Sequence, residues 1–182
     1  MLRKLLPALM SLCAAMTITA AYRTSAAATT RGELTVRPAA VATTVVAAPL
    51  KRHVAMRFAL SKAGGWYNYG GNGPRNYDCS GLTTAAYARA GISLPRVAAD
   101  QRYSGKTVAV DLRHARWGDL VFWGTGHVEL FSSRVWSHGR LVGFKSFGAH
   151  HTGTRISYRV NYLSSSYARQ AHFEYVAGAG AR

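Results

Sequence analysis

Cys79 is the residue of this chain best suited to nucleophilic chemistry. It directly follows Asp78 and the glycine-rich run 67–74, and it precedes an alanine-rich stretch that ends at Gly91. This order predicts a loop that delivers Cys79 to the first turn of a helix, with Asp78 as N-cap and Gly91 just beyond the last turn. The positive end of the helix dipole would then favour the reactive thiolate. The alternative is a small buried apolar residue, a common environment for a free cysteine.

The N-terminal residues 1–28 have the pattern of a secretory signal peptide: a cationic start, an apolar stretch over 5–21 and small residues at 26–28. The apolar stretch is short for a membrane anchor. Leu12 stands before Cys13, where a lipoprotein signal requires a small residue. Cleavage would remove Cys13 and leave Cys79 as the one cysteine of a protein outside the cytoplasm. Such a thiol is either reactive or bonded to another chain.

The charge is strongly positive, with 23 Lys and Arg against 7 Asp and Glu. Loss of the three basic residues before position 29 leaves 20 against 7, which is +13. A basic surface attracts polyanions. The basic residues are scattered singly and form no RNA-binding signature, so we expect an anionic cell wall and no nucleic acid as partner. A merely solvated arginine-rich surface is the alternative.

The sequence divides into a signal peptide at 1–28, an Ala/Thr/Val/Pro-rich spacer at 29–50 and one domain at 51–182. Hydrophobic periodicity in the domain changes from helical in the first half to strand-like in the second. Helices followed by strands predict an α+β fold, with helices packed on an antiparallel sheet of about five to six strands. The expected helices lie before Gly64 and at 79–90 and 96–103, and the expected strands at 107–110, 119–123, 127–131, 141–147, 154–158 and 172–176.

His127 is the best candidate for the base that a cysteine nucleophile requires. It opens an expected strand directly after the glycine turn 124–126, at the edge of the sheet. The alternative is an ordinary surface histidine, since the chain has seven.

Four segments together resemble the signature of the NlpC/P60 family of cell-wall cysteine peptidases. They are 67–82, which contains Asp-Cys-Ser-Gly-Leu, then 91–95 with Gln101, then 117–122, and finally His127-Val128. They occur in the family's order. The resemblance implies a papain-like fold and hydrolysis of an amide bond in peptidoglycan stem peptides, usually between D-γ-glutamate and diaminopimelate or lysine. It implies no metal or cofactor.

The resemblance also implies roles for individual residues. Cys79 matches the nucleophile, and His127 matches the base. Tyr67 matches a tyrosine that helps to form the oxyanion and substrate site. Asp78 and Ser80 match positions that bind the free amine of the stem's N-terminal alanine in some members, with helix capping as the alternative for Asp78.

Two departures concern the surroundings of the histidine. Trp117 stands where the family often has proline, which we interpret as a changed turn. Glu129 stands where glycine is common, and strand alternation places it on the same face as His127. We expect Glu129 to contact substrate or to pair with an arginine, with a solvent-facing edge residue as the alternative.

The third departure concerns the residue that orients the imidazole. The family usually places His, Asn, Gln or Glu on the strand after the histidine strand, and here Gly148 occupies that position. His150 lies two residues on and is our expected third member, with His151, Ser146 or a backbone carbonyl as alternatives.

The sequence therefore predicts a secreted, wall-associated, monomeric peptidoglycan endopeptidase. Three alternatives stay open: an N-acetylmuramoyl-L-alanine amidase of related fold, a non-catalytic basic wall-binding module, and a toxin that uses the same chemistry against competing cells.

Overall fold

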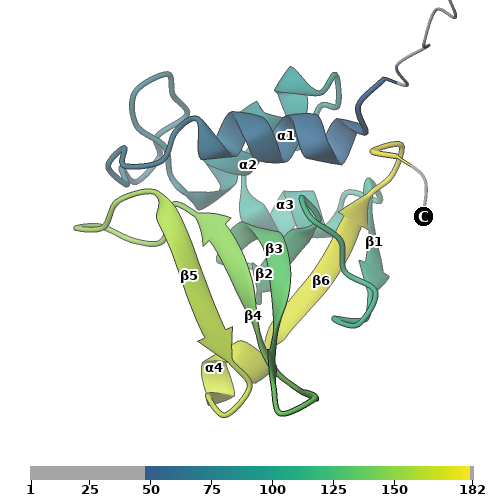
Figure 1. Ribbon diagram of the computed structural model, residues 1–182. Coiled ribbons are helices and arrows are strands. Elements are labelled where there is room, and N and C mark those ends of the chain that lie inside the picture. The colour runs from purple at the N-terminus through teal and green to yellow at the C-terminus, as the bar shows by residue number, and fades with distance from the viewer. Residues whose placement is uncertain (1–47, 181–182) are drawn as a thin grey trace, which may run out of the picture. The chain divides into compact units, whose positions relative to one another are not determined.

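A computed structural model of the chain describes residues 48–180 (Figure 1). The predicted signal peptide and residues 29–47 of the predicted spacer lie outside the described residues. Described residues that belong to no regular element form the connecting loops and turns. The elements, in order, are α1 (Lys51–Leu60), α2 (Cys79–Arg89), α3 (Ala98–Tyr103), β1 (Thr107–Val110), β2 (Leu120–Trp123), β3 (His127–Ser137), β4 (Arg140–Gly148), β5 (Ser157–Tyr162), α4 (Ser166–Arg169) and β6 (Ala171–Val176).

The strands form one six-stranded sheet in the order β1-β6-β2-β3-β4-β5, and every neighbouring pair is antiparallel. Figure 1 shows α1 and α2 packed against one end of the sheet, while the β3–β4 hairpin extends away from them. The predicted α+β architecture is thus confirmed.

Helix α2 starts and stops where the sequence predicts. The Asp78 carboxylate accepts a hydrogen bond of 2.6 Å from the Gly81 N–H, which satisfies one of the unpaired donors of the first turn. Gly91 follows the last turn with φ = 74°, a left-handed conformation that glycine adopts without strain. Leu82 and Ala86 are fully buried. The cap therefore fixes the register that sets Cys79 at the helix start.

Strand alternation divides the sheet between two apolar layers. Leu120, Phe122 and Val128 face the helices and belong to the main core. Val121 and Trp123 face the opposite side, in a second cluster that includes Ala168 of α4. Since His127 is paired with Trp123 in the β2–β3 register, its side chain lies on this second face.

Some boundaries differ from the predictions. The strand expected at 154–158 is found at Ser157–Tyr162, and β3 continues to Ser137. Two register shifts in the β3–β4 ladder interrupt the alternation that sequence reading depends on. Helix α4 was not predicted because it has four residues, too few to show a helical period. No helix among residues 48–180 is long and apolar enough to cross a membrane.

Candidate active site

Cys79 is the first residue of α2 and lies in the wall of a surface cleft of about 440 Å³. Its exposed fraction is 8%, so the thiol is mostly sheltered but open to the cleft. The cleft is lined by residues of both the helical half and the β2–β3 turn: Tyr67, Tyr69, Gly70, Asp78, Cys79, Ser80, Arg96, Val97, Ala98, Thr125 and Gly126. A substrate bound there would meet the sulfur directly.

His127 is the first residue of β3, and its imidazole is fixed from one side by a carboxylate. The Nε2 atom lies 2.7 Å from Oε1 of Glu129. A side-chain hydrogen bond joins the same ring to Cys79. With Nε2 engaged by the carboxylate, Nδ1 is the nitrogen left for the thiol. The side chains of Cys79 and His127 are therefore in contact, as the sequence predicts.

The pair favours a thiolate and an imidazolium. Burial alone would raise the pKa of Cys79, but the hydrogen bond and charge of His127, with the Val128 backbone N–H, lower it below its usual value. Burial alone would lower the pKa of His127, but its hydrogen bonds to Cys79 and Glu129 raise it to about 9. Both shifts act in the direction that moves the thiol proton onto the imidazole.

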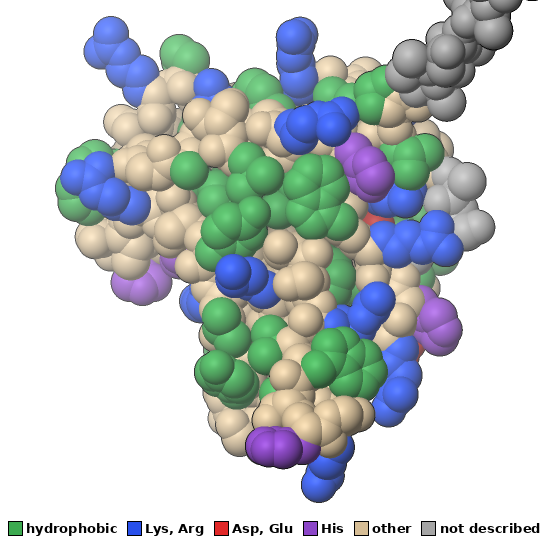
Figure 2. Space-filling model, viewed as in Figure 1, with side chains coloured by type: hydrophobic (Ala, Val, Ile, Leu, Met, Phe, Trp, Pro, Cys, Tyr) green, Lys and Arg blue, Asp and Glu red, His purple; other side chains and the backbone are tan. Residues whose placement is uncertain are grey.

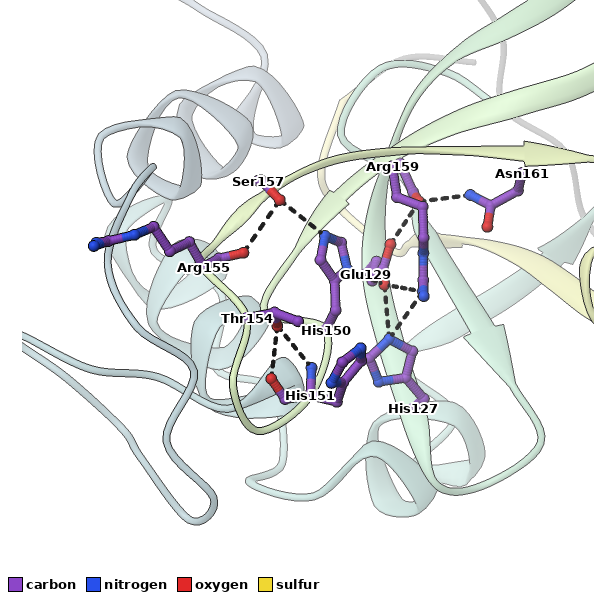
Figure 3. A network of polar contacts seen from close by, with 10 residues as sticks. His127, Glu129, His150, His151, Thr154, Arg155, Ser157, Arg159 and Asn161 are labelled. Atoms are coloured by element: carbon purple, nitrogen blue, oxygen red, sulfur yellow. Dashed lines mark hydrogen bonds and ion pairs between the residues drawn. The ribbon is translucent and has the colours of Figure 1, made fainter.

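Glu129 is fully buried beneath this pair. Oε1 faces three donors, since His127, His150 and Arg159 all contact it, and Oε2 accepts from the Ser146 hydroxyl at 2.5 Å (Figure 3). The predicted arginine partner is confirmed as Arg159. The solvent-facing alternative is wrong. A side chain without accessible surface also offers nothing to a substrate in this structure.

Burial alone would raise the pKa of Glu129, but the hydrogen bonds of His127 and His150 and the charge of Arg159 hold it far below its usual range. The carboxylate is therefore ionised at any pH at which the protein would act. It supplies the negative charge that keeps the neighbouring imidazole protonated.

His150, the expected third member, reaches the site through Glu129. Its Nδ1 lies 2.8 Å from Oε1 of Glu129, and its Nε2 lies 3.2 Å from the Ser157 hydroxyl. Of its expected alternatives, Ser146 also contacts Glu129, whereas His151 is exposed and bonds to the carbonyl of Thr152. The contacts thus place two of these three side chains around the carboxylate.

The helical side of the cleft contains a second carboxylate–arginine pair. Arg96 makes two hydrogen bonds to Asp78, of 2.7 and 3.0 Å, and further ones to the Ser80 hydroxyl and the Gly71 carbonyl. Helix capping by Asp78 is therefore confirmed, and both of its oxygens are also engaged by Arg96. A stem-peptide amine would have to share Asp78 with that guanidinium.

Tyr67 lies in the cleft wall and is partly buried. Burial, followed by the charge of Cys79, raises the pKa of its hydroxyl. The hydroxyl therefore stays protonated and can donate a hydrogen bond in the cleft that Cys79 also lines.

His127, Glu129 and His150 bring possible metal-ligand atoms within 4.8 Å of one another. Arg159 donates to the same carboxylate oxygen, so a cationic group of the protein already pairs with the negative charge of Glu129. This donor set is better explained as an internal ion-pair network than as a metal site.

The sequence predicted an arginine partner for Glu129 without identifying it as Arg159, and it gave no role to Arg96. Arg159 lies 30 residues beyond its carboxylate, on an edge strand, and no local pattern links the two. Arg96 directly follows the Leu94-Pro95 segment of the resemblance, so its position next to a recognised motif was the available signal.

The sequence model described as NlpC/P60 family matches residues 64–176. The chain belongs to the NlpC/P60 family. The probable endopeptidase p60 of Listeria monocytogenes is 45% identical over 69 residues, which are 36% of this chain and 14% of the relative. The bifunctional muramidase/DL-endopeptidase CwlT of Bacillus subtilis is 33% identical over 118 residues, 60% of this chain and 34% of the relative. The chain thus spans only a part of these relatives.

Solved structures of the family share the fold. A lipoprotein-like NLP/P60 family protein of Staphylococcus aureus is 33% identical, with a TM-score of 0.53 over 69% of this chain and 41% of that chain. RipD of Mycobacterium tuberculosis, described as a non-catalytic NlpC/p60 domain protein, is 22% identical, with a TM-score of 0.50 over 71% of this chain and 99% of that chain. The papain-like fold expected from the sequence is confirmed.

Proposed function

We propose that this NlpC/P60 protein is a secreted peptidoglycan hydrolase, a cysteine peptidase that cleaves the stem-peptide bond between D-γ-glutamate and diaminopimelate or lysine. The observation that carries the proposal is the Cys79–His127 pair, a thiol of lowered pKa beside a histidine of raised pKa in an open cleft. The endopeptidase names of family relatives support the choice of substrate.

The proposed reaction uses the pair in two steps. The Cys79 thiolate attacks the carbonyl carbon of the scissile amide, and the His127 imidazolium gives its proton to the departing amine. This step leaves a thioester on Cys79. A water molecule then loses a proton to His127 and attacks the thioester, which releases the carboxylate product and restores the thiolate.

The negative oxygen of each tetrahedral intermediate needs donors close to the sulfur. The first amides of a helix have no intrahelical acceptor. Asp78 takes the Gly81 N–H with its side chain and the Leu82 N–H with its carbonyl, and neither contact uses the Cys79 amide. We assign the Cys79 N–H and the Tyr67 hydroxyl as the two donors.

Asp78 and Ser80 are proposed to lie against the N-terminal end of the stem peptide. Both border the cleft beside Cys79, and their polar atoms are joined through Arg96. A free alanine amine would bind where Asp78 remains reachable past the guanidinium.

The surface charge supports action at an anionic wall. Figure 2 shows Lys and Arg side chains spread singly over the visible face, with very little acidic surface between them. Such a distribution favours non-specific attraction that salt screens. We expect the monomeric protein to bind insoluble peptidoglycan less well as salt is added, and binding that does not change with ionic strength would contradict this role.

The decisive experiment is mass spectrometry of purified muropeptides after incubation with the wild-type protein and with Cys79→Ser. Tri- and tetrapeptide stems are included, both with and without the sugar. We expect new fragments from the wild type alone, with masses that correspond to a break after D-γ-glutamate. Fragments with a break between the sugar and L-alanine would instead identify an amidase.

Binding without any fragment would favour a wall-binding module. RipD, which is described as adapted to peptidoglycan binding, shows that the fold occurs in that class of protein. A pull-down on insoluble peptidoglycan with wild type and Cys79→Ser separates the hydrolase from the binding module. For a hydrolase, both proteins should bind, but only the wild type should release fragments.

A further inference from the structure

Gly148 at the end of β4 is required for space and not for backbone conformation. It is absent from the described glycines that have positive φ. A Cβ atom built on Gly148 would lie 2.6 Å from Cγ of Glu129 and 3.1 Å from its Cβ. Any side chain at position 148 would therefore displace Glu129, so the missing side chain on β4 makes the room that the Glu129 side chain on β3 fills.

The Glu129 side chain, which fills this space, directs its carboxylate toward the imidazole of His127. Glu129 projects from β3 two residues after His127, on the same face of the same strand. Figure 3 shows His127, His150 and Arg159 converging on it from β3, the loop after β4 and β5. Asn161 donates to the Ser146 hydroxyl at 2.9 Å, and that hydroxyl donates to Glu129. The carboxylate is thus held on both oxygens.

The contact with Glu129 favours the His127 ring with a proton on Nε2. Nε2 of His127 lies 2.7 Å from the carboxylate, which can only accept, and 3.4 Å from a nitrogen of Arg159, a longer contact that would require an unprotonated Nε2. An unprotonated Nε2 would lose its contact with Glu129. The contact with Glu129 therefore favours a proton on Nε2, which leaves Nδ1 as the nitrogen available to Cys79.

We propose that Glu129 is the positioning residue for His127, and that the Glu129–Gly148 pair moves this role from β4 to the strand of the histidine itself. The inference rests on the proposed cysteine-peptidase function. His150 and Ser146 fix the carboxylate without touching His127, and Arg159 fixes it as well while making only the longer contact of 3.4 Å with the ring. No substrate contact is assigned to Glu129.

The test compares Glu129→Gln with the wild type in two measurements. The first is the rate of Cys79 alkylation by iodoacetamide against pH, which requires no substrate and follows thiolate formation. The second is kcat and KM on a muropeptide substrate. We expect the alkylation profile to shift to higher pH and kcat to fall about a hundredfold or more, with KM little changed. An unchanged alkylation profile in the folded variant would overturn the proposal.

Glu174 provides a matched control. It is also a buried glutamate paired with an arginine, with its Oε1 3.4 Å from Nε of Arg102. Glu174→Gln should lower stability without shifting the alkylation of Cys79. An equal shift in both variants would show a general loss of packing and would contradict the specific role.

A second pair of variants moves the carboxylate between the strands. Glu129→Gly should be nearly inactive, and Glu129→Gly combined with Gly148→Glu should recover part of kcat. A double variant no better than the single one would count against the spatial exchange.

The wild type alone also tests the inference, should the variants not fold. The titratable and charged groups around the pair are Tyr67, Asp78 and Arg96 on the helical side and Glu129, His150, Arg159 and Tyr167 on the sheet side. Nitrogen-15 NMR of the histidine rings should show His127 protonated at Nε2 with a pKa well above the usual value. A His127 that titrates normally would overturn the proposal. Because the NMR and alkylation measurements use no peptidoglycan, failure of the hydrolase function would remain distinguishable.

Discussion

The two sides of the cleft each contain a carboxylate paired with an arginine, but the two carboxylates differ in how completely they are buried. On the helical side, the Arg96 side chain is 35% exposed and that of Asp78 is 11% exposed. On the sheet side, the Arg159 side chain is 29% exposed and that of Glu129 has no exposed surface. Exposed pairs contribute little to stability, whereas removal of one partner of a buried pair leaves an uncompensated charge. We therefore expect stability to depend less on the first pair than on the second.

The largest expected effect comes from removing the cation of the buried pair. Arg159→Met should lower the free energy of unfolding by about 3–5 kcal/mol, because Glu129 would remain ionised and buried without that partner. Chemical denaturation at neutral pH measures it. Arg155→Met is the neighbouring control, since that guanidinium lies over Trp66 at the surface and should matter by about 1 kcal/mol or less. Equal losses in both variants would contradict the distinction.

A methyl group at Gly148 should have the next largest effect. Gly148→Ala would force Glu129 to move, with an expected loss of about 1–3 kcal/mol, typical of overpacking. Gly126→Ala is the control for stability, because a Cβ atom there would meet nothing within 4 Å. In a Glu129→Ala background the Gly148→Ala loss should shrink, and a loss of unchanged size would show that Glu129 is not the obstacle.

The pH profile tests the charge state that the sheet side imposes. Activity should be bell-shaped, since the reaction needs the Cys79 thiolate and the protonated His127. As pH falls through the lowered pKa of Cys79, the thiolate is lost, and as pH rises through about 9, His127 loses its proton. Each limb should fall about tenfold per pH unit, with midpoints that belong to the coupled pair. Activity still rising at pH 10 would contradict this assignment.

The smallest effect is expected on the helical side. Arg96→Met should lower stability by about 1 kcal/mol or less, because the pair is partly exposed and Asp78 keeps its cap to Gly81. Thermal denaturation beside Arg159→Met gives the comparison directly. A loss as large as that of Arg159→Met would mean that the two carboxylates are equally dependent on their arginines.

The helical half could be predicted because its signals are local. Asp78, Cys79 and Gly91 are cap, first turn and terminating glycine of one helix, and each role depends on residues a few positions away. The order of helices and strands likewise came from hydrophobic period. Strand β5 was misplaced by three residues at its start because exposed edge-strand positions carry little periodic signal.

The orienting network could not be predicted in the same way. The sequence placed Glu129 on the same strand face as His127 and left its role open. It predicted that His150 would orient the ring of His127, whereas His150 contacts Glu129 instead. Which side chain reaches the ring depends on the space above Gly148 and on Arg159, which lies on another strand. Such contacts follow from the register of β3, β4 and β5 and have no local sequence pattern.

The sequence by itself predicted the family, through four motifs that occur in the family's order, and the class of fold, through caps, glycine turns and hydrophobic period, which are short-range properties. The same motifs predicted that Cys79 and His127 act together. Only the tertiary structure decided which carboxylate faces the imidazole and which arginines face the carboxylates. Burial made that choice, since an ionised Glu129 is stable in the interior only where three strands supply donors to both of its oxygens.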